Sequence, residues 1–296
     1  MLLLFPTAFA GIVYSMRNKG YGGIILCGLF SLITVAVSFV VPSTTSMMIF
    51  VLSGLIILTI AILKNWFGVK RIYALLLVYL PTTAGIGIPL LSSRRFWELM
   101  ALVFDQASDT IGEGYMAYIT RQLLSGAKFI GQGSLPHNTG AMTVSQILPS
   151  INNDFLLTYI IHRFGWVAFI GVVALFAVFI MRALILCLKQ KSVLASLVSL
   201  SVIVTMTLQT ICYIAVNLGF QVFSTLSLPL ISQGNAFLLI NMGLVGLLLS
   251  VFRTGYFMND KAESRKATRN SFLRFEDGKM IVDFKHLRIP RSTVGK

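Results

Sequence analysis

The residues that could carry chemistry are concentrated in one stretch of the chain, residues 92–163. All five acidic residues that precede position 253 lie in it: Glu98, Asp105, Asp109, Glu113 and Asp154. Basic residues of the same stretch are Arg94, Arg95, Arg121, Lys128 and Arg163. It also contains the glycine pairs Gly112/Gly114 and Gly131/Gly133, and glycines let the backbone approach a ligand closely. We therefore expect a ligand to bind here.

Asp154 has two interpretations. Asn152, Asn153 and Asp154 directly precede an apolar periodic run, residues 155–161. One of these three polar side chains could cap the N-terminus of a helix formed by that run. Alternatively, Asp154 could be a catalytic carboxylate, and the local pattern leaves both interpretations open.

The overall composition is that of a membrane protein. Apolar residues make up 56% of the 296 residues and charged residues only 11%, whereas a soluble domain carries about 25% charge. With 24 basic and 10 acidic residues the net charge is +14, which we attribute to membrane orientation and not to nucleic-acid binding. A soluble enzyme and a disordered chain are also excluded. Cys27, Cys187 and Cys212 lie singly in apolar runs and predict neither disulfides nor a metal site.

Seven apolar runs are long enough, or nearly so, to cross a hydrocarbon core of roughly 30 Å. They are residues 2–16, 22–41, 46–63, 72–91, 164–188, 193–217 and 235–252. We therefore predict an all-α, polytopic helical membrane protein. Its membrane domain covers residues 1–252 and includes one large extracytoplasmic loop, residues 92–163.

The distribution of basic residues predicts the orientation. Lysines and arginines follow alternate spans: Arg17, Lys19, Lys64, Lys70, Arg71, Arg182, Lys189 and Lys191, with eleven more after the last span. By the positive-inside rule these connections are cytoplasmic, so the N-terminus is expected outside and the C-terminus inside. The tail, residues 253–296, carries eleven basic and five acidic residues. It could rest on anionic lipid as a mobile extension or remain solvated without a specific partner.

A second polar segment, residues 224–235, precedes the last span on the outside. Its sequence is STLSLPLISQGN, which predicts a re-entrant or broken segment, because irregular backbone at membrane depth needs protein or water partners. Ser232, Gln233, Gly234 and Asn235 would form a polar wall. We expect this wall and Asp154 to share one outward-facing cavity.

Several motifs occur in a familiar order. Residues 228–235 (LPLISQGN) and 241–246 (NMGLVG) resemble the pattern P-L-P-F-[IV]-S-Y-G-G-S-S and the span that follows it in the SEDS family (shape, elongation, division and sporulation), the FtsW/RodA/SpoVE-like membrane proteins. Residues 112–115 are similar to the family's G-x-G-Y-Q, and residues 125–133 to its S-G-G-x-x-G-x-G. Residues 148–155 (LPSINNDF) are similar to its L-P-E-x-H-T-D-F without a gap.

The resemblance implies a fold and an activity. Family members have ten spans with both ends in the cytoplasm, and the loop that carries the aspartate joins spans seven and eight. Because that loop here follows the fourth predicted span, the first three family spans are expected to be missing. The implied reaction polymerises lipid II, an undecaprenyl-pyrophosphate-linked disaccharide, at the outer face of the bacterial cytoplasmic membrane. The implied partner is a class B penicillin-binding protein.

The resemblance also implies roles for individual residues. Asp154 matches the aspartate that the family's activity is thought to need, as a base for the attacking hydroxyl or as a ligand of a divalent cation such as magnesium. We assign no other metal ligand and no cofactor. Basic residues of the loop could hold the pyrophosphate: Arg94, Arg95, Arg121 and Lys128. Alternatively, these charges position the loop at the lipid headgroups.

The chain also departs from the family pattern. Residues 6–11 resemble its P-S-E-F-A-K, with the glutamate replaced by Ala8 and the lysine by Gly11. Further replacements are Ser150, Asn152, His162, Arg163, Gln233 and Asn235. Three functions therefore remain open. The first is a divergent SEDS glycosyltransferase acting in division, elongation or sporulation. The second is a non-catalytic scaffold that binds the transpeptidase or the lipid precursor, and the third is a lipid flippase or transporter.

Overall fold

The computed structural model describes residues 4–38, 44–83, 115–135, 144–148, 153–220, 227–231, 235–255, 273–276 and 279–282. These residues are almost entirely helical, so the predicted all-α fold is confirmed. The helices that coincide with predicted spans are α1 (Phe5–Met16), α2 (Gly20–Ser38), α3 (Thr44–Leu63), α4 (Arg71–Thr82), α10 (Trp166–Leu188), α11 (Val193–Asn217) and α12 (Asn235–Thr254). A short 3₁₀ helix, η2 (Arg17–Lys19), joins α1 to α2.

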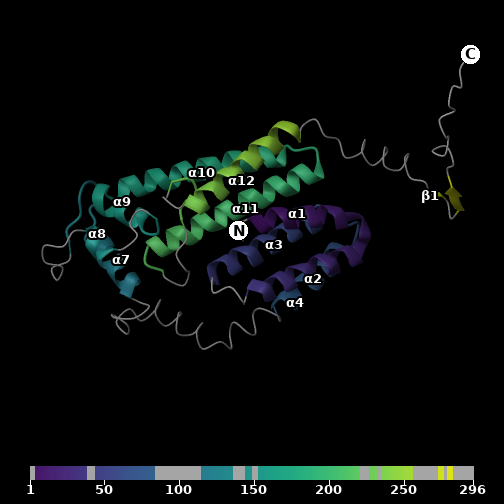
Figure 1. Cartoon of the computed structure of the whole chain (residues 1–296), viewed down its shortest axis with the longest axis horizontal. Helices are drawn as coiled ribbons and strands as arrows, with labels where there is room; N and C mark the ends of the chain where they lie inside the picture. Colours follow the sequence, from purple (N-terminus) through teal and green to yellow (C-terminus); the bar gives the residue numbers. More distant parts are fainter. Residues whose placement is uncertain are drawn as a thin grey trace, which may run out of the picture.

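Three shorter helices lie within the predicted outer loop: α7 (Tyr115–Ser125), α8 (Val144–Ile147) and α9 (Leu156–Phe164). They gather at one end of the elongated helical bundle, whereas α12 ends at the opposite end (Figure 1). The three short helices of the predicted loop therefore lie at one end of the bundle, and that end carries Asp154.

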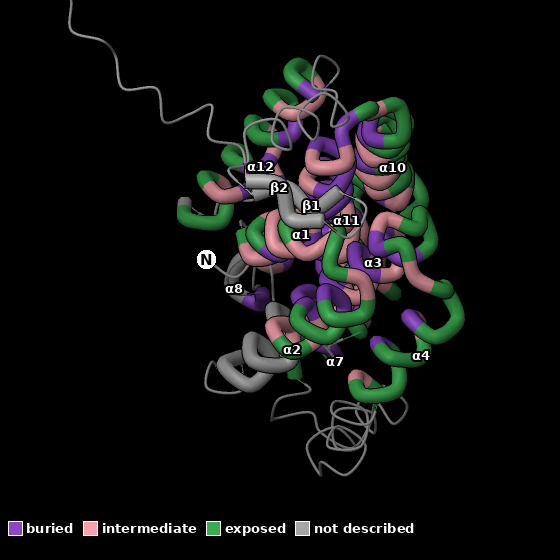
Figure 2. Tube along the Cα trace, turned by 90° about the vertical axis from the view of Figure 1, so that its right-hand side faces the viewer, coloured by how far each residue is buried: buried purple, intermediate pink, exposed green. Residues whose placement is uncertain are grey.

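Helix α11 is the centre of the bundle. It packs against α1, α3, α9, α10 and α12. Within its apolar 18-residue window 72% of the residues are buried, against 11% for α10 and 17% for α12. Figure 2 shows the same contrast, with the outer helix α10 mostly exposed. Because most exposed residues of α10 and α12 are apolar, these helices face lipid and α11 is shielded from it.

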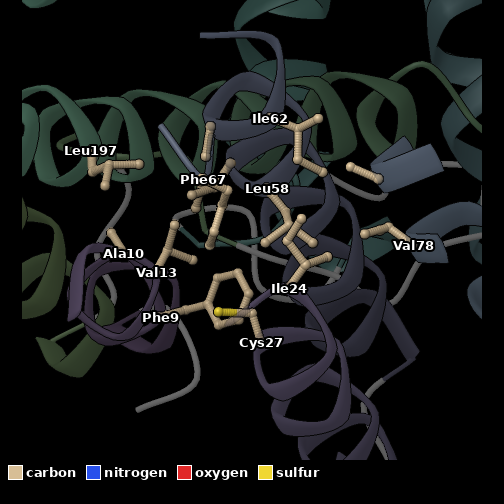
Figure 3. Packing of buried hydrophobic residues seen from close by; sticks show 13 residues of the cluster. Phe9, Ala10, Val13, Ile24, Cys27, Leu58, Ile62, Phe67, Val78 and Leu197 are labelled. Atoms are coloured by element: carbon tan, nitrogen blue, oxygen red, sulfur yellow. The ribbon is translucent and has the colours of Figure 1, made fainter. Parts of the chain in front are cut away.

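The largest apolar cluster joins α11 to the first four helices. Phe9, Ala10 and Val13 of α1 point toward Ile24 and Cys27 of α2 and toward Leu58 and Ile62 of α3, with Leu197 of α11 on the other side (Figure 3). Helix α1 begins with Pro6 in its first turn, a position where the missing N–H costs nothing. The two halves of the bundle are thus held together by apolar side chains at α1 and α11.

Three helices are long and apolar enough to cross a membrane within the described residues: Trp166–Leu188, Val193–Asn217 and Ala236–Thr254. The segments Met48–Leu63 and Arg71–Thr82 are apolar but shorter. The remaining residues of the predicted span 72–91, from 84 onward, lie outside the described residues, as do the residues before position 4.

The tail contains a β-hairpin that we did not expect from the sequence. Strand β1 (Leu273–Glu276) pairs antiparallel with β2 (Lys279–Val282), and Glu276 faces Lys279 in the register. The two residues between the strands are Asp277 and Gly278, a dipeptide that favours tight hairpin turns. This dipeptide is the sequence feature that indicates a hairpin, although the tail around it is highly charged.

Orientation can be tested with one residue in the predicted outer loop and one just after the C-terminal end of α10. Ser125 at the end of α7 and Lys189 after α10 are both exposed, and the three natural cysteines are buried. In intact cells, a membrane-impermeant maleimide should label Ser125→Cys and should not label Lys189→Cys. The reverse pattern would show that the end carrying Asp154 is cytoplasmic.

Candidate functional site

The side-chain amide of Asn217 is fully buried at the C-terminal end of α11 and makes four hydrogen bonds. Its Oδ1 accepts from the Thr158 backbone N–H and from Thr158 Oγ1, both at 3.0 Å. Its Nδ2 donates to the carbonyl oxygens of Asp154 at 2.9 Å and of Tyr213 at 3.0 Å. These bonds use both acceptor positions and both donors of the amide. The four residues, which we call the Asn217 cluster, therefore fix the turn before α9 onto the end of α11.

Tyr213 reinforces this attachment from one helical turn below. Its hydroxyl donates to the carbonyl oxygen of Asn153 at 3.5 Å. The tyrosine ring is buried among Leu157 and Ile161 of α9. The backbone of Asn153 and Asp154 is therefore held by α11.

Asp154 itself is half-buried. Helix α9 begins at Leu156 with Phe155 at its N-cap position, so Asp154 lies one residue before the cap. The interpretation that Asn152, Asn153 or Asp154 occupies the N-cap is wrong for this helix. Phe155 takes the position because its ring is buried beside Val216 of α11, and tertiary packing overrides the preference for a polar cap.

Arg121 lies at the same end of α11. Its guanidinium stands over the Phe220 ring, 5.6 Å from the centroid, and its side chain packs directly on Gly219. A Cβ at Gly219 would come 2.5 Å from Arg121 Cγ, and the φ of this glycine is +86°. Ile119 and Leu123, on the same helix as Arg121, share an apolar cluster with Phe155. The fold thus brings Arg121 and Asp154 into contact with the same short segment, residues 217–220.

Lys128 lies elsewhere, on a ten-residue segment that we call the strap, residues 126–135. The Gly133 N–H donates to the His162 carbonyl oxygen at 2.8 Å, and the Trp166 N–H donates to the Lys128 carbonyl oxygen at 3.2 Å. The Lys128 side chain is exposed. The structure therefore attaches Lys128 to the junction of α9 and α10, and not to α11 as it does Arg121.

Residues 227–231 are the part of the second polar segment, before α12, that the structure describes, and they pack against α9 and α11. Gln209 of α11 donates through Nε2 to the Ser227 carbonyl oxygen at 2.9 Å. Leu228 is buried in the cluster that contains Leu157 and Tyr213. Residues 227–231 and the start of α9 thus contact the same part of α11.

Other predicted site residues cannot be placed. Arg94, Arg95, Ser232, Gln233 and Gly234 lie outside the described residues, and Asn235 is described only as the first residue of α12. The shared outward-facing cavity of Asp154 and residues 232–235 therefore stays a prediction.

Sequence reasoning missed three residues that hold the site: Thr158, Tyr213 and Asn217. Each stands within a predominantly apolar run, where single polar residues are common and uninformative. The one available signal was that Asn217 ends the 193–217 span, since an amide at membrane depth needs partners.

The described residues do not form a metal site by themselves, since no three His, Cys, Asp or Glu side chains lie together among them. In phosphate-handling sites Mg²⁺ is typically held by one or two carboxylates together with substrate phosphates. Asp154 is the residue here that would hold such an ion. What the arrangement offers chemically is one carboxylate on a backbone that is held to the end of α11, and one guanidinium that packs on residues 219 and 220.

We predict that replacing Asn217 by leucine lowers the stability of the protein. The change would leave the Thr158 N–H and the Asp154 carbonyl without their partner, at about 1–3 kcal/mol for each buried polar group left unsatisfied. Asn241 is the matched control, because it is equally buried but neither of its amide atoms has a hydrogen-bond partner among the described residues. Thermal unfolding in detergent should show a clear loss for Asn217→Leu and little or none for Asn241→Leu. Equal losses would mean that the Asn217 cluster contributes nothing specific.

The amino-acid sequence matches one protein family and is similar to several named bacterial proteins. The sequence profile of the FtsW/RodA/SpoVE family, described as cell cycle protein, matches residues 1–256. The probable peptidoglycan glycosyltransferase FtsW of Saccharophagus degradans is 27% identical over 197 residues, which are 64% of this chain and 48% of that protein. The protein of the same name from Xanthomonas oryzae pv. oryzae is 28% identical over 188 residues, 62% of this chain and 37% of its own length.

A solved structure shows the same fold. A chain from a peptidoglycan synthase complex superposes with a TM-score of 0.60 at 19% identity, covering 86% of this chain and 70% of the other. The chain spans about half, or less, of the length of the curated relatives it matches. Because the family profile covers most of the sequence, the resemblance noted from the motifs is confirmed, and the chain belongs to the FtsW/RodA/SpoVE family.

Proposed function

We propose that the chain acts as a divergent peptidoglycan glycosyltransferase that polymerises lipid II at the outer face of the bacterial cytoplasmic membrane. Its family membership and the names of its relatives support this class of reaction. The observation that carries the proposal is the Asn217 cluster, which fixes the backbone of Asp154 with a buried hydrogen bond. A fixed backbone limits the positions that the Asp154 carboxylate can reach, which favours its use as a base in a proton-transfer step.

The reaction joins the 4-hydroxyl of one disaccharide to C1 of another. The new C1–O bond forms as the bond from C1 to the pyrophosphate oxygen breaks, and undecaprenyl pyrophosphate leaves with its electron pair. Asp154 would accept the proton of the attacking hydroxyl. Arg121, held on Gly219 and Phe220 at the same end of α11, would stabilise the charge of the leaving pyrophosphate. A divalent cation held by Asp154 and the phosphates would supply further positive charge there.

A class B penicillin-binding protein is the proposed partner. The structural neighbour belongs to a peptidoglycan synthase complex that couples polymerization to crosslinking. The crosslinking of glycan strands requires a transpeptidase, and a partner of this type would use the polymer as it is made.

A non-catalytic scaffold is the second candidate, and helix α1 favours it. Phe9, Ala10 and Val13 are buried in the main cluster, whereas Ala8 is exposed and Gly11 is half-exposed. Ala8 and Gly11 replace the two charged residues of the family pattern at this helix. A chain that keeps Asp154 without these charges could bind the precursor or the transpeptidase and lack the reaction.

We predict that Asp154→Asn abolishes polymerisation without unfolding the protein. Asparagine keeps the size of the side chain, and the hydrogen bond from Asn217 goes to the backbone of residue 154, so the turn should persist. Loss of the base should lower glycan polymerisation by roughly 10²–10⁴-fold. The assay uses purified protein, lipid II and a class B penicillin-binding protein, with thermal unfolding as the check on folding.

Two outcomes would contradict this prediction. Activity of Asp154→Asn equal to that of the unmutated protein would remove Asp154 from the reaction. No activity of the unmutated protein, with lipid II and the transpeptidase present, would favour the scaffold.

Restoring the two family charges is a separate test of the scaffold. We predict that Ala8→Glu combined with Gly11→Lys raises polymerisation above that of the unmutated protein. A Cβ at position 11 would have no other atom within 4 Å, so a side chain fits there. Glutamate and lysine three residues apart on a helix attract each other. The neutral pair Ala8→Gln with Gly11→Met is the control. An equal effect of both pairs would attribute the gain to helix stability and not to charge.

A further inference from the structure

The strap, residues 126–135, is bound along its length to the junction of α9 and α10. The Gly131 N–H donates to the Phe164 carbonyl oxygen at 3.1 Å, and the Val167 N–H donates to the Phe129 carbonyl oxygen at 3.2 Å. A Cβ at Gly165 would lie 2.5 Å from the Phe129 carbonyl oxygen, so this close approach requires glycine. The strap is therefore held at the depth of the first turn of α10.

That depth is the boundary of the membrane. Helix α10 has 23 residues, which at a rise of 1.5 Å per residue span about 35 Å, slightly more than the roughly 30 Å hydrocarbon core. Trp166 and Lys189 must then lie near the two membrane surfaces, and Trp166 is an amphipathic residue typical of such positions.

The strap presents large apolar side chains to the outside at this boundary. Phe129 is 67% exposed and Ile130 is 73% exposed, next to Phe164 at 59%. They continue a ridge of exposed apolar residues along α10: Val167, Ile170, Leu175, Val178 and Met181. Because steps of three and five residues keep these side chains on one broad side of a lipid-facing helix, the strap extends the same lipid-facing surface.

Two positive side chains lie beside this apolar patch among the residues that the structure describes. Lys128 and Arg163 are exposed, and Arg163 donates one N–H to Gln132 Oε1 at 3.0 Å, which holds it against the strap. Basic side chains beside exposed aromatic and aliphatic residues match the headgroup and upper acyl region of an anionic leaflet.

We propose that the strap is a membrane anchor: Phe129 and Ile130 insert into the leaflet at the end of the bundle that carries Asp154, and Lys128 and Arg163 bind anionic headgroups. The anchor fixes the loop region at the depth where a lipid-linked substrate presents its head. Lys128 accordingly belongs to the membrane boundary and not to the pyrophosphate site.

The depth of the strap can be measured in nanodiscs. A nitroxide attached at Ile130→Cys is tested for collisions with oxygen, which dissolves in lipid, and with a nickel complex, which stays in water. The expected result is protection from nickel at a depth of roughly 5–10 Å below the headgroup surface. A label at Leu175→Cys marks the hydrocarbon core, and free nitroxide marks water. The unmutated protein, whose cysteines are buried, gives the background.

The electrostatic part is tested by comparing phosphatidylcholine discs with discs that contain phosphatidylglycerol. The anionic lipid should deepen the label at position 130, and the double variant Lys128→Gln/Arg163→Gln should remove this difference. Lys189→Gln, at the opposite end of α10, should leave it unchanged. If the double variant keeps the difference, headgroup binding by these two residues is overturned.

Other outcomes would overturn insertion itself. Nickel collisions at position 130 equal to those of free nitroxide would place the strap in water. Protection that arises only when a transpeptidase is added would assign the patch to a protein partner. Neither result depends on polymerase activity, so failure of this inference is distinguishable from failure of the proposed function.

Discussion

The buried amide of Asn217 is the interaction on which the arrangement of this end of the bundle depends. Burying an amide destabilises the folded protein by several kcal/mol if its donors and acceptors have no hydrogen-bond partners. Here all four hydrogen-bonding positions of the amide are used by Thr158, Asp154 and Tyr213. Because the geometry of four bonds to one planar group is restrictive, the turn before α9 can adopt only one position on α11. The backbone of Asp154 is held in that position.

The rest of α11 explains why such an amide is tolerated. Its buried serines and threonines bond back to carbonyl groups of their own helix, as Ser199 does to Ala195 at 2.7 Å and Thr205 to Ser201 at 2.8 Å. These side chains therefore add little polarity to the interior, and apolar residues of α1, α3, α10 and α12 cover the helix. At the C-terminal end the pattern changes, and Asn217 bonds to a different element. Most of α11 is thus covered by apolar side chains, whereas its C-terminal end makes the hydrogen bonds that hold the turn before α9.

Several differences between expectation and structure have one cause. Phe155 caps α9 although three polar residues precede it, because its ring packs beside Val216. Arg121 and Lys128 look equivalent in the sequence, yet the first packs on Gly219 and the second lies exposed on the strap. Local preferences act within one turn or helix, whereas these positions depend on contacts with other elements. The β1–β2 hairpin differs from these positions, because a local feature, the Asp-Gly dipeptide between its strands, is enough to indicate it.

The sequence by itself determined the class of fold and pointed to Asp154. Long apolar runs must form helices in a membrane, because only helices satisfy their backbone hydrogen bonds within one segment. The order of the motifs identified Asp154 as the candidate catalytic residue. Only the tertiary structure decided which residues hold it. Asn217 and Asp154 are 63 positions apart, and Thr158 and Asn217 are 59 apart. Hydrophobic periodicity describes the faces of each helix separately and contains no information on which polar residue meets which across such a separation; that pairing follows from how the helices pack.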